Sequence, residues 1–266
     1  MDDLAFRDLR FHRLGAMRSG TAFSPVSLFA NGEAGDAWVA DRDWCYTKSG
    51  GGVYERVTTS GDIMARWKGM ANGINADQDD VAKRPAYMEG SGTAWGQYDG
   101  VNDGLSTPNI DFTNTDKISV FTSSTTSVTN DRSLIELGGN YNSKDGLRVS
   151  MPSQGINSSA SGVTGYKIIV SGGISMNTPY IVASNMTRGS TTPTGRLNRT
   201  QAMTVSRDDI LSGNYGNLYL SVGSREGTTL FHGGRIYGLV LRGALSNLTE
   251  IAATENYLAE LSGVTL

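Results

Sequence analysis

The stretch "AWGQYDGVNDGLSTPNIDF", residues 94–112, places two acidic turns between an aromatic run and a run typical of a β-strand. Each turn pairs an aspartate with a glycine, which suits positions next to hairpins that need a positive φ. The carboxylates of Asp99 and Asp103 are expected to accept hydrogen bonds from nearby backbone amides, as in Asx-type turns. The strands expected on either side favour this turn interpretation and mark the start of a β-sheet protein.

The same acidic and aromatic residues leave two binding alternatives open. A calcium ion held by Asp99, Asn102 and Asp103 is the first, because carboxylate and amide oxygens are calcium ligands. A sugar is the second. No cofactor other than this calcium is indicated by the sequence.

From residue 91 to about residue 245, apolar and polar residues alternate with the period of half-buried antiparallel strands. Glycine-rich turns separate these short runs, and no helical pattern lies between them. The fifth run is apolar on both faces, which predicts a central strand covered on both sides. The runs are "KISVFTS" (117–123), "DGLRVSM" (145–151), "GYKIIVSG" (165–172), "NLYLSVGS" (217–224) and "GRIYGLVLRG" (234–243). They predict an all-β sandwich.

The chain ends in a different period, which predicts one C-terminal helix over 247–261. Leu248, Ile251, Leu258 and Leu261 fall on one helical face. Asn247 and Glu250 form a capping-box pattern, and Gly263 stands where a C-terminal cap belongs.

The region before the sandwich divides into two parts. Residues 1–20 alternate aromatic and aliphatic with charged side chains, and are expected to form an N-terminal arm. Residues 21–90 carry three of the four tryptophans in short apolar runs, too short for a separate core. This segment is expected to pack on or lead into the sandwich of residues 91–266.

Composition excludes several classes of function. A net charge of −3 with dispersed basic residues gives no electrostatic case for nucleic-acid binding. The start of the chain is too charged for a secretory signal, and no apolar run approaches the ~18 residues of a membrane span. The single cysteine, Cys45, cannot form an intramolecular disulfide and is expected to be a small buried hydrophobe. We expect a protein made in the cytoplasm, without membrane insertion.

Catalytic motifs are absent from the sequence. It contains no phosphate-binding loop, no nucleophile elbow and only two histidines, His12 and His232. The motif E-x-D-x-x-E, which places two glycosidase acids on one strand face, is missing. Glu136 has Arg132 and Leu134 as its same-face neighbours along the chain. The chain is therefore predicted not to be an enzyme, and a catalytic pair assembled from distant strands stays an alternative.

Three stretches together resemble a concanavalin A-like lectin/glucanase (LamG-type) domain. "YDGVNDGLSTPNIDFTNTDKISVF" is similar to its entry strand, "LYLSVGSREGTTLFHGGRIYGLVLRGALS" to its late hairpin, and "EIAATENYLAELSGVTL" to its closing helix. The resemblance covers about residues 94–266 and implies a two-sheet antiparallel jelly roll. Upstream, "SLFANGEAGDAWVADRDW" resembles tailed-phage virion proteins and their prophage relatives. There it departs from the family, having "VADRDW" where relatives carry a "Y-D-P-S-D" type stretch.

The resemblance implies a virion structural protein, a fibre, spike or decoration subunit, whose lectin-like domain contacts host-surface glycan. The loop "GGNYNSKDGLR" is the best sugar-binding candidate, through Asn140, Tyr141, Asn142, Asp145 and Arg148. An ordinary polar hairpin turn is its alternative. Multivalent binding would make the protein a homo-oligomer, by analogy a trimer.

Two other functions stay open beside this one. The first is a purely structural capsid or tail component without a ligand. The arm would then dock on another virion protein through its apolar residues Leu4, Phe6, Leu9 and Phe11. The second is a polysaccharide depolymerase.

Overall fold

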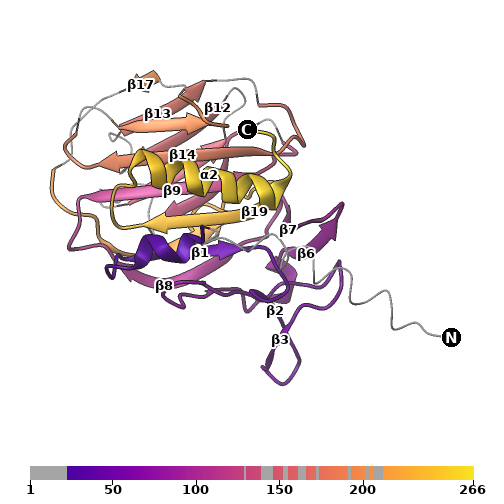
Figure 1. The fold of residues 1–266 in the computed structure, drawn as a ribbon. Helices are drawn as coiled ribbons and strands as arrows, with labels where there is room; N and C mark the ends of the chain where they lie inside the picture. Colours follow the sequence, from indigo (N-terminus) through magenta and orange to yellow (C-terminus); the bar gives the residue numbers. More distant parts are fainter. Residues whose placement is uncertain are drawn as a thin grey trace.

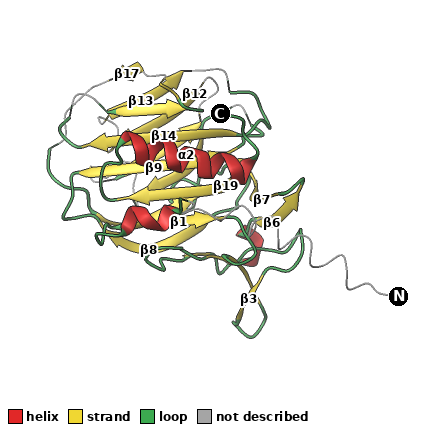
Figure 2. Ribbon diagram, in the orientation of Figure 1, coloured by secondary structure: helices red, strands yellow, loops and turns green. Residues whose placement is uncertain are grey.

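The computed structural model describes residues 23–128, 130–138, 146–151, 155–160, 166–171, 174–190, 193–201, 204–206 and 212–266. Two antiparallel β-sheets face each other, and one α-helix lies against the outer side of one sheet (Figures 1 and 2). The predicted all-β, jelly-roll-like sandwich with a C-terminal helix is confirmed. The expected arm, residues 1–20 with Leu4, Phe6, Leu9 and Phe11, lies outside the described residues.

The smaller sheet has eight strands and carries the helix. Its central strand β19 pairs with β1, β7 and β9, and is buried along nearly its whole length, as the two-sided apolar pattern predicted. The strands are β1 (Gly35–Val39), β6 (Ala86–Gly90), β7 (Thr93–Asp99), β9 (Lys117–Ser124), β14 (Tyr180–Thr187), β15 (Thr194–Leu197), β16 (Thr200–Gln201) and β19 (Gly233–Arg242).

The larger sheet has eleven strands in the order β17-β13-β12-β11-β10-β18-β8-β5-β4-β2-β3. They are β2 (Cys45–Lys48), β3 (Tyr54–Arg56), β4 (Arg66–Trp67), β5 (Ala76–Asp77), β8 (Leu105–Asp111), β10 (Arg132–Leu137), β11 (Leu147–Met151), β12 (Gly155–Ala160), β13 (Tyr166–Ser171), β17 (Thr204–Ser206) and β18 (Asn217–Val222).

The segment before residue 91 contributes strands to both sheets. β1 pairs with β19 in the smaller sheet, and β5 joins β8 in the larger one. Two short 3-10 helices, η1 (Pro25–Phe29) and η2 (Val81–Lys83), begin at Ser24 and Asp80, whose side chains accept the first free amides.

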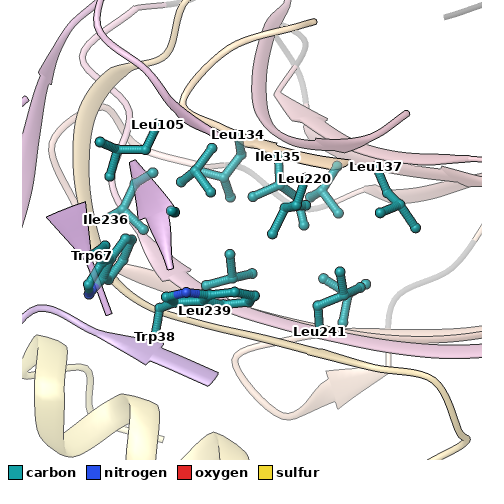
Figure 3. Packing of buried hydrophobic residues seen from close by; sticks show 14 of the residues in the cluster. Trp38, Trp67, Leu105, Leu134, Ile135, Leu137, Leu220, Ile236, Leu239 and Leu241 are labelled. Carbon is teal, nitrogen blue, oxygen red and sulfur yellow. The ribbon is translucent and has the colours of Figure 1, made fainter. Parts of the chain in front are cut away.

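The main hydrophobic core fills the space between the sheets. Side chains of β10 and β18 face those of β1 and β19 across it, and Trp67 closes one side (Figure 3). Period-2 alternation explains this packing, because every second residue of each strand points inward. Ile118 and Val120 of β9 lie in this core as predicted, whereas Phe121, the residue after Val120, points to the opposite side of the sheet.

Helix α2 (Leu248–Ser262) covers the outer face of the smaller sheet. Asn247 and Glu250 form the predicted capping box, and Gly263 ends the helix with a φ of 73°. Ile251 and Leu258 pack on the sheet as predicted. The prediction for Leu248 is wrong: its side chain is 76% exposed, because the first turn of the helix lies over a groove instead of over packed side chains.

Candidate functional site

The outer face of the larger sheet carries an unbroken row of polar side chains, the polar row. Cross-strand pairing aligns one residue from each of eight successive strands: Arg56, Tyr46, Arg66, Asp77, Ser106, Ser221, Glu136 and Arg148. The residues that alternate with them, such as Leu105, Val222 and Ile135, lie in the core. Helix α2 covers the outer face of the smaller sheet, whereas the polar row lies on the outer face of the larger sheet.

Toward β11, the polar row is buried beneath the loop that joins β18 to β19. Glu136 is 3% exposed, and Ser221 beside it is fully buried. The backbone amide of Glu226 donates to Oε2 of Glu136 at 3.2 Å. A Cβ atom on Gly227 would lie 3.9 Å from the Ser106 hydroxyl, which places this loop directly over the row.

The Glu136 carboxyl has an unusual pKa because it is buried. Burial raises the pKa of Glu136 to about 7, against the lowering effect of Arg148 and with a further raising effect from the carboxylate of Glu226. Nη2 of Arg148 lies 3.1 Å from both carboxylate oxygens of Asp131. The positive charge of Arg148 is thus divided between Asp131 and Glu136. Glu136 is therefore a carboxyl that changes protonation near neutral pH.

Replacing Glu136 with glutamine is expected to flatten the pH dependence of stability. The folded-state pKa of about 7 lies above the ordinary value of 4.5, so this carboxyl stabilises the fold most below its ordinary pKa. That contribution is lost as the pH rises through the folded-state value. Between about pH 4 and about pH 8, the wild type should lose about 3 kcal/mol of unfolding free energy relative to E136Q. Urea unfolding of both proteins across this range measures the difference.

Because His232 and Asp103 also titrate, only the difference between the two proteins is informative. Both groups are present in the wild type and in E136Q, so their contributions cancel. Parallel stability curves for the two proteins would contradict the assignment.

Half-buried groups lie on the same face of the sheet, outside the part that the loop covers. Arg66 donates to both oxygens of Asp77 at 2.8 and 2.7 Å, and its guanidinium lies 3.6 Å from the centre of the Tyr54 ring. Tyr219 lies two residues before Ser221 on the same face of β18 and is half-buried. Its pKa is raised by burial and then by the neighbouring Glu226 and Glu136 carboxylates. An aromatic ring next to fixed donors and acceptors is the combination that holds a sugar.

The predicted sugar loop meets this site at one end. Asn140, Tyr141, Asn142 and Asp145 lie outside the described residues. Arg148, the last residue of the loop, is opposite Glu136 and buried in the polar row.

The acidic turn of residues 99–103 is closed by its own carboxylates. Oδ1 of Asp99 accepts the amides of Val101, Asn102 and Asp103 at 2.8, 3.1 and 3.3 Å. Oδ2 of Asp103 accepts the amide of Asp99 at 2.9 Å. The predicted Asx-type hydrogen bonds are thus confirmed. In the part of the chain that the structure describes, no three His, Cys, Asp or Glu side chains cluster as a metal site would require.

The carboxyl of Asp103 is buried as well as hydrogen-bonded. Its side chain is 7% exposed, and burial raises its pKa to about 6. Calcium binding by Asp99, Asn102 and Asp103 remains a prediction, and binding measurements with a chelator test it.

Sequence reasoning missed the partners of Glu136 because it considered neighbours along one strand. A bulge between Ser133 and Ile135 turns Leu134 into the core, so Leu134 is not on the Glu136 face. The actual neighbours, Arg148, Ser221 and Glu226, come from other strands and from a loop. The alternation of "RSLIEL" could have marked Glu136 as an outward residue, but not its partners.

Sequence comparisons gave no relative: no family model matches the chain, and no curated protein matches it. Solved structures share its fold. A GH54 α-L-arabinofuranosidase aligns with a TM-score of 0.62 at 8% identity, over 90% of this chain and 66% of that one. The binding domain of botulinum neurotoxin serotype G gives 0.53 at 12% identity, over 82% and 51%. A Trypanosoma rangeli sialidase gives 0.51 at 11% identity, over 86% and 32%.

These similarities establish the all-β sandwich fold. At such low identity they extend to the fold alone, and the chain spans less than two thirds of each of these three proteins. Among the described helices, none has the length and apolar character needed to cross a membrane.

Proposed function

We propose that this chain is a carbohydrate-binding protein that holds glycan on the outer face of its larger sheet. The part of the polar row that the loop leaves accessible, from Arg56 to Asp77, carries this proposal, because it aligns ring, guanidinium and carboxylate groups along a line that an oligosaccharide could follow. Tyr219 would stack on the C–H face of a sugar ring, and Arg66 with Asp77 would hydrogen-bond to vicinal hydroxyls. One of the proteins with this fold, an arabinofuranosidase, is described in complex with arabinofuranosyl-xylobiose.

A glycan array with the wild type and Tyr219→Ala tests this proposal. The wild type should bind at least one class of glycan, and loss of the Tyr219 ring should weaken that binding about tenfold, since a stacked aromatic contributes roughly 1–3 kcal/mol. Tyr257→Ala is the matched control, because Tyr257 is a half-buried tyrosine on α2, outside the polar row. Surface plasmon resonance with the best glycan gives the affinities.

Each result of the array has a definite meaning. Binding that Tyr257→Ala weakens as much as Tyr219→Ala would place the site elsewhere. An array without any bound glycan would overturn the proposal and favour a purely structural component. We propose that binding needs no metal, so the same array with a chelator should give the same affinities; a loss would favour calcium at Asp99, Asn102 and Asp103.

We further propose that the protein belongs to a phage or phage-like virion, as a fibre, spike or decoration subunit. This part is supported by the sequence resemblance of the N-terminal segment and of the three stretches within residues 94–266. A homo-oligomer, by analogy a trimer, would give the multivalency that weak sugar contacts require. Imaging of intact particles with an antibody to this chain tests the location and the copy number.

Glycoside hydrolysis is the second candidate function, favoured by one observation. Burial raises the pKa of Glu136 to about 7, a second carboxyl group lies near it on Glu226, and pairs of carboxyl groups serve as acid and base in glycosidases. Two facts support binding without catalysis: Glu136 is 3% exposed, and it already accepts the amide of Glu226. Release of reducing sugar by the wild type but not by E136Q would establish hydrolysis.

A further inference from the structure

A groove lies on the other side of the molecule, next to the first turn of helix α2. Its volume is about 480 Å³, within the size range of small-molecule sites. The lining includes Arg196, Arg199, Thr194 and Leu248, and none of the described residues that line it is acidic. The core and both sheets separate this groove from the polar row.

Strand register places the groove on the outer face of the smaller sheet. Arg196 pairs with Ala183, and Thr194 pairs with Asn185. Because Ala183 packs beneath the helix, Arg196 and Thr194 point to the helix side as well. The guanidinium of Arg196 therefore projects into the space beside the first turns of α2.

Fixed partners hold both arginines in place. Nη2 of Arg196 lies 3.0 Å from Oε2 of Glu255, whose side chain is fully buried. Nη2 of Arg199 donates to Oδ1 of Asn256 on the helix. The turn that carries Arg199 is anchored because Oδ1 of Asn198 accepts the amide of Ile181 at 2.8 Å. The Arg196 guanidinium is thus held by the Glu255 carboxylate, and the Arg199 guanidinium by the Asn256 side chain.

The helix amides are not the binding groups of this groove. The side chain of Asn247 already accepts the amides of Thr249 and Glu250. By contrast, Nε of Arg196 is buried and has no hydrogen-bond partner among the described residues. The positively charged groups that line the groove are therefore the guanidinium groups of Arg196 and Arg199.

We infer that this groove binds the carboxylate of a sugar acid through Arg196 and Arg199. Guanidinium groups bind carboxylates with two parallel hydrogen bonds, which fixes the orientation of the ligand. The exposed hydroxyl of Thr194 is available to a sugar hydroxyl, and the exposed side chain of Leu248 offers an apolar contact to the ring. The sugar part of this inference rests on the proposed function, whereas the carboxylate part follows from the two arginines alone.

Isothermal titration calorimetry of the full chain with glucuronate tests the inference. Glucuronate should bind, glucose should bind at least tenfold more weakly, and Arg199→Gln should reduce the glucuronate affinity about tenfold. Arg199→Lys should give an intermediate loss, because it keeps the charge but not the planar fork. Arg42→Gln is the matched control, an exposed arginine paired with Glu89 outside the groove. Circular dichroism confirms that each variant is folded.

The outcomes separate the two proposals. Equal glucuronate affinity in the wild type and Arg199→Gln, or no detectable binding at the highest soluble concentration, would overturn the site. Acetate bound as tightly as glucuronate would overturn the sugar part. The Tyr219→Ala variant should bind glucuronate normally, so loss of array binding and loss of glucuronate binding report on different sites.

Discussion

Replacing Asp36 with alanine is expected to lower the free energy of unfolding by more than about 4 kcal/mol, because a fully buried carboxylate organises an entire loop. Oδ1 of Asp36 accepts the amides of Ala37 and Ala71, both at 2.7 Å. Oδ2 accepts the amides of Asn72 and Ile74 at 3.1 and 2.8 Å. Alanine would leave four amides without this acceptor, and a buried amide without an acceptor costs about 1–3 kcal/mol.

The position of this loop explains why removing the Asp36 carboxylate would also disturb the core. The loop passes close beside the carboxylate, since a Cβ on Gly69 would lie 2.1 Å from Oδ2 of Asp36. It also supplies the carbonyl of Ile74 that accepts the indole N–H of Trp38 at 2.8 Å. Trp38 is fully buried in the core between the sheets. Asp36 thus couples an irregular segment to the packing of the central core.

Chemical unfolding followed by tryptophan fluorescence measures this effect. Asp36→Asn should be intermediate, because it keeps one accepting oxygen and places an amide donor against backbone donors. Asp111→Ala is the matched control: this exposed aspartate accepts the Thr113 amide in an Asx-type turn, and its loss should leave the unfolding midpoint nearly unchanged. Similar unfolding midpoints for the two alanine variants would show that the Asp36 carboxylate is not a structural centre.

Replacing Arg242 with methionine is expected to cost about 3–5 kcal/mol at neutral pH, because it leaves two carboxylates facing each other. The buried guanidinium of Arg242 lies 2.7 Å from Oε1 of Glu33 and 3.1 Å from Oε1 of Glu250, and it donates to Ser246. Although burial raises the pKa of Glu33, hydrogen bonds from Arg242 and Asn31 hold it at about 2. The network joins the chain before β1, the end of β19 and the first turn of α2.

The pH dependence distinguishes this network from ordinary packing. The folded-state pKa of Glu33 lies below its ordinary value, so its contribution is present above that value and is lost as the pH falls toward 2. The cost of Arg242→Met should therefore shrink under acidic conditions, where the Glu33 carboxylate becomes protonated. Denaturant unfolding at neutral and acidic pH measures this change.

Two further variants test the explanation. The triple variant Glu33→Gln, Arg242→Met, Glu250→Gln should recover much of the lost stability, because it removes the unpaired charges. Arg56→Met breaks an exposed pair with Asp43 and should leave the stability nearly unchanged, because solvent screens exposed ion pairs. A pH-independent cost for Arg242→Met, equal to that of the triple variant, would indicate lost packing instead of lost charge compensation.

Local patterns in the sequence determined the elements of this protein. Alternation in "KISVFTS" predicted β9, the two-sided apolar run "GRIYGLVLRG" predicted β19, and the capping residues Asn247 and Gly263 predicted the ends of α2. The aspartates of residues 99–103 form the turn that their spacing indicated. Each of these features depends on residues within a few positions of one another, where backbone geometry and hydrogen bonding are set by local chemistry.

Only the tertiary structure decided which of these residues meet. The polar row requires the register of eight strands, and the alternation within one strand gives its faces but not its partners. Strand pairing and a loop bring Arg148, Ser221 and Glu226 next to Glu136. The loop whose amides bind Asp36 lies more than thirty residues away along the chain. Arg196 and Arg199 line a groove only because α2 folds back over β9 and β14, which brings its first turns beside β15. The sequence by itself determined the strands, the turns and the helix, whereas pairing between distant strands determined both candidate binding sites.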